Sequence, residues 1–502
     1  MTHSVGQRVA AGAALMVLLK TAVRLIGIAS ILILVRVLDP DDFGIVALAF
    51  VTVSILESVT EPLIQPYLIR AERPDNAVYD CAWTLGVLRG VAIGAVIAAA
   101  GPLAAWSIDE PRLVPLMAVF ALTPVLQGLE NVGMVGHMRD LRYDVVLVWR
   151  LSSKIAGTLT TIPLAIIFAS YWALAAGIVA GRVVSLIASY WLSDYRPRPR
   201  LSGAGDMVHF AKWMFGYGIL DTIESYLMTV MLGRLAGSGA VGTFNVAYTV
   251  AAMPCSEIAA PVREPLYAAL AAARDRPSEF AHQYLTGLGL LTLIVLPMSV
   301  GIALVAPQLV PVALGATWTH ATVLVQLCAL YALLDALSAY TINLFLVRGR
   351  VRQMVMIFAA LLAVRVPAAI WGFHAGGIDG AAAGLLGTAL LGAIVWHVMA
   401  ARMLGVPVRA LAGTMSRSIG AAAAMSAAVI ALQRAPALSW LAAEPVLWLV
   451  LLVAGGAVVH IVAQAALWRA AGLPAGPETQ AVRQARALWN RLAGRAGLPQ
   501  FR

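Results

Sequence analysis

Charged residues are scarce in this sequence. Only 12% of its 502 residues are Asp, Glu, Lys or Arg, whereas 61% are hydrophobic, and the mean hydropathy is +0.85. A soluble chain is about one quarter charged and about half apolar. Because the apolar excess runs along nearly the whole length, we predict a polytopic membrane protein rather than a soluble domain with an anchor. Barrel strands would alternate every second residue, so the pattern favours an all-α protein.

Cysteine is also rare, and its placement argues against several kinds of site. Cys81, Cys255 and Cys328 lie in or beside apolar segments, and their spacing does not suit a metal. We expect them to fill the core without forming a disulfide. The sequence shows no nucleophile, metal or nucleotide motif. We therefore predict a protein that is not an enzyme, with no catalytic residue, no metal site and no cofactor.

About fourteen apolar runs are long enough to cross a bilayer as helices. The first run exceeds 20 residues and contains Lys20 and Arg24, so we read it as an uncleaved span rather than a signal peptide. The predicted spans are 13–37, 43–63, 80–102, 113–133, 145–168, 171–192, 208–233, 240–260, 283–306, 321–346, 353–373, 379–401, 411–431 and 445–468.

The net charge of +10 follows the loops and is not the mark of a nucleic-acid partner. Arginines gather in the loops after even-numbered spans and are sparse after odd-numbered ones, which puts both termini in the cytoplasm. The even loops hold Arg70, Arg73, Arg139, Arg142, Arg196, Arg198, Arg200, Arg274, Arg276, Arg348, Arg350, Arg352, Arg402 and Arg409, and the odd loops hold Arg36, Arg112, Arg234 and Arg434.

The spans suggest four parts. We predict an N-terminal six-helix lobe at 1–200, a C-terminal six-helix lobe at 201–404, two extra transmembrane helices at 405–470 and a basic amphipathic cytoplasmic tail at 471–502. In the tail, ETQAVRQARALWNRLAGR places apolar residues on one helical face and arginines on the other. We expect this helix to lie on anionic membrane lipids, and a solvated basic tail is the alternative.

An internal repeat links the two lobes. RVLDPDDFGIVALAF, from Arg36, and RLAGSGAVGTFNVAY, from Arg234, share Arg, Gly, Ala and an aromatic residue at the same spacing, 198 positions apart. The matched pairs are Arg36/Arg234, Gly44/Gly242, Ala49/Ala247 and Phe50/Tyr248. Six spans separate the copies, so the lobes have the same orientation. Parallel repeats of this kind are typical of transporters, with the substrate site between the halves.

The acidic DPDD stretch at 39–42 allows two interpretations. Some lipid-using glycosyltransferases bind a metal with an acidic pair in their first external loop. Here the loop is only a few residues long, and helix capping accounts for all four residues. Asp39 suits the cap, Pro40 suits the first helical position, and Asp41 and Asp42 favour the positive end of the helix.

Several stretches together resemble a known family. They are VRVLDPDDFGIVALAF, HMRDLRYDVV, YWALAAGIVAGRVVS, GRLAGSGAVGTFNVAYTVAAMP and LPMSVGIALVAPQLVPVALGATWTHA. In this order they resemble the polysaccharide transporter branch of the multidrug/oligosaccharidyl-lipid/polysaccharide (MOP) exporter superfamily, which includes O-antigen and exopolysaccharide flippases. The resemblance covers about 10–400 and departs from the family at ESVTEPLIQPYLIR, where two glutamates and two prolines stand near a usual glycine turn.

The resemblance implies two lobes around a cavity that opens alternately to each side of the bacterial inner membrane. The implied cargo is an oligosaccharide linked to undecaprenyl pyrophosphate. Within the predicted spans the first lobe is biased towards cations and the second towards acids. Each buried charge is costly, and guanidinium groups match phosphate oxygens well. We therefore expect Arg24, Lys20, Arg150 and Lys154 to line a pyrophosphate-binding cavity.

Two alternatives stay open for these charges. Lys20 lies about 10 Å into its span and could reach the inner surface, whereas Arg24 lies about 17 Å in. Arg24 could instead pair with Glu57 or Glu61 on the next helix and only stabilise the lobe. Asp221 and Glu224 are candidates for coupling transport to H⁺ or Na⁺.

Two other functions compete with a flippase. A cation-coupled drug antiporter of the same superfamily would have to carry cationic cargo past a cationic lobe, which repulsion in a low dielectric disfavours. A membrane-embedded glycosyltransferase or polymerase would need a long external loop with catalytic residues, and the external loops here are short.

Overall fold

The described part of the chain is almost entirely helical in the computed structural model. The structure describes residues 23, 26–27, 29–60, 76–139, 142–201, 204–255, 266–267, 269–270, 273–435, 444–474, 476–480 and 482–483. No strand occurs in these ranges. The prediction of an all-α membrane protein is confirmed, because nine helices within these ranges are long and apolar enough to cross a membrane.

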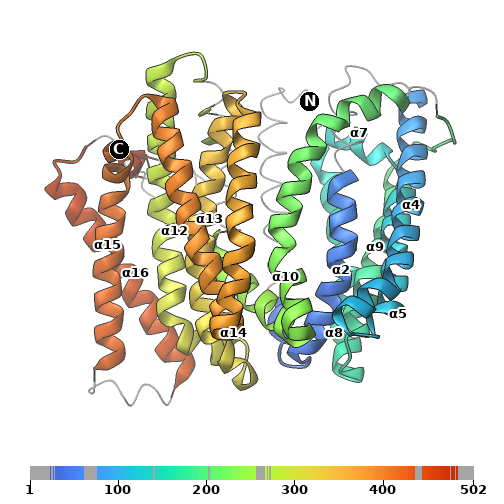
Figure 1. Cartoon of the computed structure of the whole chain (residues 1–502), viewed down its shortest axis with the longest axis horizontal. Helices are drawn as coiled ribbons and strands as arrows, with labels where there is room; N and C mark the ends of the chain where they lie inside the picture. Colours follow the sequence, from blue (N-terminus) through green and yellow to red (C-terminus); the bar gives the residue numbers. More distant parts are fainter. Residues whose placement is uncertain are drawn as a thin grey trace, which may run out of the picture. The chain divides into compact units, whose positions relative to one another are not determined.

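Contacts divide the chain into two compact units, Met1–Val246 and Ala247–Arg502. This division falls later in the chain than the lobe boundary predicted at 200/201, and that boundary stays a prediction. The helices of the first unit, drawn from blue to green in Figure 1, are α2 (Pro40–Thr60), α4 (Asn76–Ile108), α5 (Leu113–Phe120), α6 (Leu122–Leu129), α7 (Gly133–Arg139), α8 (Tyr143–Phe168), α9 (Trp172–Leu192) and α10 (Ala204–Pro254), which ends in the second unit.

Small residues let the helices of the first unit pack closely. At the α8–α9 contact, a Cβ on Gly177 would overlap the Thr161 hydroxyl, and the Ser153 hydroxyl donates to the Gly181 carbonyl at 2.8 Å. Small and hydroxylated side chains are the usual means of helix association in lipid, where apolar side chains gain nothing by leaving their surroundings.

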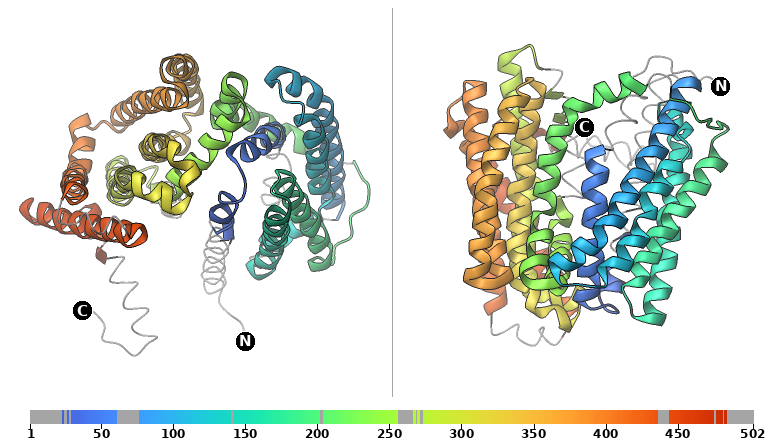
Figure 2. Two further views of the ribbon diagram at one scale, coloured as in Figure 1. Left: turned by 90° about the horizontal axis from the view of Figure 1, so that it is seen from below. Right: turned by 45° about the vertical axis from the view of Figure 1, so that its right-hand side comes forward.

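The second unit contains α12 (Pro277–Ala313), the short 3₁₀ helix η3 (Ala316–Ala321), α13 (Thr322–Val347), α14 (Val351–Leu404), α15 (Val408–Arg434) and α16 (Pro445–Ala470), which Figure 2 shows from two further directions. Its core lies between α12 and α13, where the fully buried rings of Tyr284 and Tyr340 stack with centroids 5.5 Å apart. Many other large apolar side chains are exposed, as expected for a surface that faces lipid.

Two helices each contain two predicted spans. α10 covers 208–233 and 240–260 as far as Pro254 and changes direction at Gly237, whose φ of 80° suits glycine. α14 covers 353–373 and 379–401 and turns at Gly376 and Gly377. The fourth predicted span, 113–133, is not one continuous helix, because the chain leaves helical geometry at Glu130.

The internal repeat has a direct structural counterpart in the first unit. A Cβ on Gly44 would overlap the Ser238 carbonyl, and a Cβ on Gly242 would overlap the Pro40 carbonyl. Ser238 follows Pro40 by the same 198 positions that separate the two glycines. The contact is therefore reciprocal, as across a two-fold axis, and it explains why the repeat keeps glycine at both positions.

The chain after α16 returns to the second unit before the described residues end. Glu478, only 6% exposed, accepts hydrogen bonds from Arg417 at 2.6 and 3.0 Å and from Gln464 at 3.1 Å. These hydrogen bonds and the Arg417 charge outweigh the effect of burial and lower the pKa of Glu478. The amphipathic helix predicted further on lies mostly in 484–502, outside the described residues, and stays a prediction.

Candidate functional site

Of the predicted pyrophosphate contacts, Arg150 and Lys154 lie in the described residues, and Lys154 is the more buried of the two. It lies eleven residues into α8, about 16 Å along the helix, and it is half-buried. Its Nζ is 3.8 Å from the position that a Cβ on Gly27 would take, so its ammonium group lies against the first predicted span. The hydrogen bond from Ser30 to Thr158, at 3.4 Å, joins the same two segments one turn further on.

Of the other predicted cations, one lies in the described residues and two lie outside them. Arg150 is exposed, with its guanidinium carbon 5.7 Å from the centre of the Trp149 ring. It stands one turn before Lys154 on α8, so the structure keeps these two on neighbouring turns. Lys20 and Arg24 lie outside the described residues, and so does Glu61.

The fourth predicted span breaks near Trp149, the residue before Arg150 on α8. α6 ends at Leu129, Glu130 is extended with φ −56° and ψ 147°, and α7 starts at Gly133. A break inside a membrane exposes backbone groups that must find partners in the protein or in a water-filled cavity. Discontinuous helices of this kind line the substrate and ion sites of many transporters.

The freed backbone groups at this break have partners on α4 and α9. The Leu129 carbonyl accepts hydrogen bonds from the Trp83 indole at 3.3 Å and from the Tyr190 hydroxyl at 3.0 Å. The Asn131 N–H donates to the Ser189 hydroxyl at 2.9 Å. The break is thus built into the structure by specific side chains, and it holds Glu130 and Asn131 in fixed positions.

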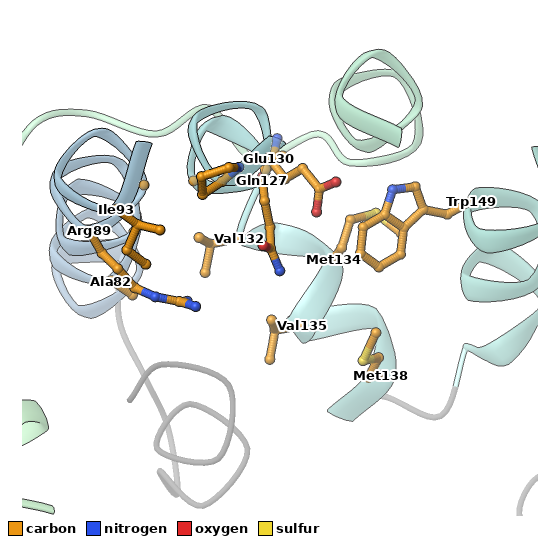
Figure 3. A pocket seen from close by; sticks show the side chains of 15 residues that line it. Ala82, Arg89, Ile93, Gln127, Glu130, Val132, Met134, Val135, Met138 and Trp149 are labelled. Atoms are coloured by element: carbon orange, nitrogen blue, oxygen red, sulfur yellow. The ribbon is translucent and has the colours of Figure 1, made fainter. Parts of the chain in front are cut away.

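A cavity of about 90 Å³ lies at the break, between α4, α6, α7 and α8. Figure 3 shows the Arg89 guanidinium and the Gln127 amide pointing into it, while Glu130 points towards Trp149 and Met134. Val132, Val135 and Met138 provide an apolar wall. The lining is mostly apolar with a few polar groups, and the space is large enough for several water molecules.

The two charged residues that line this cavity, Arg89 and Glu130, have hydrogen-bond partners on α2 and α9. The Glu130 carboxylate accepts a hydrogen bond from Ser185 at 2.6 Å. Glu57 lies 3.8 Å from Arg182, and its backbone carbonyl accepts a hydrogen bond from Arg89 at 3.1 Å. The sequence did not predict these contacts, because they join residues on different helices.

The predicted coupling residues occupy a different part of the first unit. Asp221 is exposed and Glu224 is half-buried, both on α10 before its turn at Gly237. The contact division places them in the first unit, whereas the sequence grouped them with the second lobe. Their role in coupling stays a prediction.

The DPDD stretch connects α2 to α10 and to the segment before α5, and we call this set of contacts around Asp41 the latch. Asp41 accepts hydrogen bonds from Ser238 and from Arg112, the latter at 2.7 Å, and Arg112 also pairs with Glu110 at 2.6 Å. Arg112 lowers the pKa of Glu110 by donating hydrogen bonds to it. Burial acts to raise the pKa of Asp41, but the hydrogen bonds from Ser238 and Arg112 outweigh it and lower that pKa. Asp41 therefore stays ionised as the centre of this latch.

The latch also clarifies the repeat positions. Gly44 and Gly242 are buried at the α2–α10 crossing, directly beside Asp41 and Ser238. Arg36 and Arg234, the other predicted repeat pair, are exposed. No group of three or more His, Cys, Asp or Glu in the described ranges could hold a metal ion, DPDD included.

The fold is that of a known class of membrane transporter. The chain is similar to the lipid II flippase MurJ in its inward closed conformation, with a TM-score of 0.73 and 10% identity over 90% of this chain and 98% of that one. It is also similar to an inward-facing multidrug resistance MATE family transporter of the MOP superfamily, with a TM-score of 0.57 and 16% identity over 78% of this chain and 98% of that one. These likenesses define a MOP-type fold.

Sequence comparison places the chain more narrowly. Residues 33–323 match the profile of the polysaccharide biosynthesis protein family, and the chain belongs to that family. It is 21% identical to the lipopolysaccharide biosynthesis protein WzxC of Escherichia coli (strain K12), over 76% of this chain and 78% of that protein. It is 24% identical to the succinoglycan biosynthesis transport protein ExoT of Rhizobium meliloti (strain 1021), over 59% and 61%. The resemblance predicted from the sequence is confirmed, and the chain is a multi-pass protein of the bacterial inner membrane.

Proposed function

We propose that this chain is a flippase for oligosaccharide repeat units linked to undecaprenyl pyrophosphate. It moves them across the inner membrane by alternating access, for lipopolysaccharide or exopolysaccharide biosynthesis. The observation that carries this proposal is Lys154, a half-buried cation about 16 Å into an apolar helix. The relatives named for lipopolysaccharide biosynthesis and succinoglycan transport, and the fold shared with a lipid II flippase, support the same cargo class.

The chemistry of the cargo explains why the protein keeps a cation within the membrane although its burial is costly. A pyrophosphate that crosses a bilayer must exchange its water for other groups that compensate its charge. An ammonium or guanidinium group within the membrane provides that compensation along the path. A drug-like cation would be repelled by the same groups, which disfavours the antiporter alternative.

Arg24 is the second member of the proposed phosphate site. It stands three residues before Gly27 in the sequence, and residues three apart share a helix face. The Lys154 ammonium lies against Gly27. We therefore expect Arg24 and Lys154 to act on the same phosphate group, with Lys20 and Arg150 one turn nearer to the cytoplasm.

The cavity at the helix break suits the sugar hydroxyl groups of the same cargo. Its charged residues have hydrogen-bond partners, its amides come from Gln127 and Asn131, and one wall is apolar. Such a lining favours neutral hydroxyl groups over a free anion or cation.

We further propose that both termini lie in the cytoplasm, that transport involves no catalytic step, and that Asp221 and Glu224 couple it to H⁺ or Na⁺.

The proposal is tested by replacing Arg24 in cells that depend on this gene for their polysaccharide. We expect Arg24→Ala and Arg24→Lys each to lower export at least tenfold and to cause accumulation of lipid-linked repeat units, with normal protein levels. Arg434→Ala, at an exposed helix end, is the matched control. Normal export by Arg24→Ala would show that Arg24 is not the phosphate contact.

A further inference from the structure

An extended basic segment follows α9 and is held rigidly against α4. This strap, residues 193–200, contains Arg196, Arg198 and Arg200, and all three side chains are exposed. Proline alternates with arginine, so the backbone has little freedom before any contact is made. With Asp194 included, the strap carries a net charge of +2 (three arginines less one aspartate).

A buried carboxylate fixes the strap in place. Asp80, 8% exposed in the second turn of α4, accepts hydrogen bonds from the Tyr195 hydroxyl and from the Arg198 N–H at 2.9 Å. The Arg200 N–H donates to the Thr84 hydroxyl at 2.8 Å, and the Asn131 amide donates to the Tyr195 carbonyl at 2.7 Å. Burial and the neighbouring Asp80 raise the pKa of Tyr195, so its hydroxyl remains a donor at neutral pH. The backbone is thus pinned at three points, and the Arg196 guanidinium also donates to the Ser193 and Tyr195 carbonyls, while all three arginine side chains remain exposed.

Exposed tryptophans indicate the depth of the strap in the membrane. Trp172 and Trp191 lie 19 residues apart at the two ends of α9, and they are 39% and 83% exposed. That separation is about 28 Å along a helix, close to the ~30 Å thickness of the hydrocarbon core. Tryptophan favours the interface at headgroup level. The strap begins two residues after Trp191, so its arginines lie at the level of the lipid phosphates.

We propose that the strap is a preorganised binding site for anionic phospholipid headgroups of the adjacent leaflet. Guanidinium groups bind phosphate oxygens in a bidentate manner, and a fixed backbone lowers the entropy lost on binding. The lipid bound here is a structural partner of the first unit, separate from the cargo site at Lys154. Because Asn131 both holds the strap and lines the cavity at the helix break, bound lipid would also stabilise that break.

Native mass spectrometry of the purified full-length protein tests this proposal, with dioleoylphosphatidylglycerol as the probe and dioleoylphosphatidylcholine as the neutral reference. We expect selective retention of phosphatidylglycerol. Each arginine at an anionic surface is worth about fivefold in affinity, so the triple change Arg196→Gln, Arg198→Gln and Arg200→Gln should lower it at least tenfold. The matched control, Arg234→Gln with Arg434→Gln, changes two exposed arginines elsewhere and should keep affinity within twofold.

A second variant distinguishes binding to the fixed strap from diffuse electrostatic attraction to a positively charged surface. Asp80→Ala removes a negative charge, so diffuse attraction would become stronger, whereas loss of the pinned backbone should weaken phosphatidylglycerol binding at least fivefold. Unchanged or tighter binding by Asp80→Ala would overturn the proposal, and so would full binding by the triple variant. Loss of undecaprenyl pyrophosphate binding by the triple variant, with phosphatidylglycerol binding kept, would assign the strap to the cargo and also overturn it.

Discussion

At the residue scale, a charge within the membrane is costly and needs a partner, either elsewhere in the fold or in the cargo. Glu57 and Glu130 are bound by groups on other helices, Arg182 and Ser185 among them, and so contribute to the packing of the first unit. Lys154 instead lies against a glycine of the first span. This difference separates charges that stabilise the fold from the charge that we assign to the cargo.

The Ser185–Glu130 hydrogen bond gives a prediction at this scale. Ser185→Ala leaves the Glu130 carboxylate with one donor fewer, and a hydrogen bond to a charged group is worth about 1.5–3 kcal/mol. We expect a thermal unfolding midpoint several degrees lower in detergent. Ser152→Ala is the control, since Ser152 donates only to a carbonyl three residues back, and its midpoint should stay near that of the wild type. An unchanged midpoint for Ser185→Ala would mean that the bond does not stabilise the break.

At the element scale, the crossing of α2 and α10 joins two segments of the first unit that are far apart in the sequence. Two backbones approach so closely that only glycine fits at Gly44 and Gly242, and the adjacent Asp41 receives hydrogen bonds from Ser238 and Arg112. The contact is reciprocal, so a motion that separates one pair of residues must separate the other.

Gly44→Ala tests the importance of this crossing. Its Cβ would overlap the backbone of Ser238, which cannot move aside as a flexible side chain could. We expect the helices to separate, with stability lowered by about 1–3 kcal/mol and polysaccharide export reduced. Gly239→Ala, on α10 next to Ser238, would meet no atom within 4 Å and should behave as the wild type. Equal behaviour of the two variants would contradict a tight crossing.

The elements also show what the sequence can and cannot predict. Within the described residues, apolar length predicted helices that are long enough to cross a membrane, because a span must be about 20 residues long whatever it packs against. The break at Glu130 was not predicted, because the partners that satisfy it, Trp83, Ser189 and Tyr190, are far away in sequence. The repeat was visible, but the contact between its two glycines required the structure.

At the scale of the whole molecule, fold and family point to one class of transport. The chain has a MOP-type fold and belongs to the polysaccharide biosynthesis protein family. The same fold also occurs in multidrug transporters, so the fold alone does not select the cargo. The cations of the first unit make that selection in our proposal, because they attract an anionic headgroup and repel cationic drugs.

The most direct test is translocation by the purified protein in liposomes. A lipid-linked oligosaccharide on undecaprenyl pyrophosphate would be supplied in both leaflets, and an added glycosidase that cannot cross the membrane would report the share that it can reach. We predict that the wild type exposes nearly all of the cargo to the enzyme, and that Lys154→Gln slows this exposure at least tenfold without unfolding the protein. Only half of the cargo cleaved with the wild type, as in protein-free liposomes, would contradict the account.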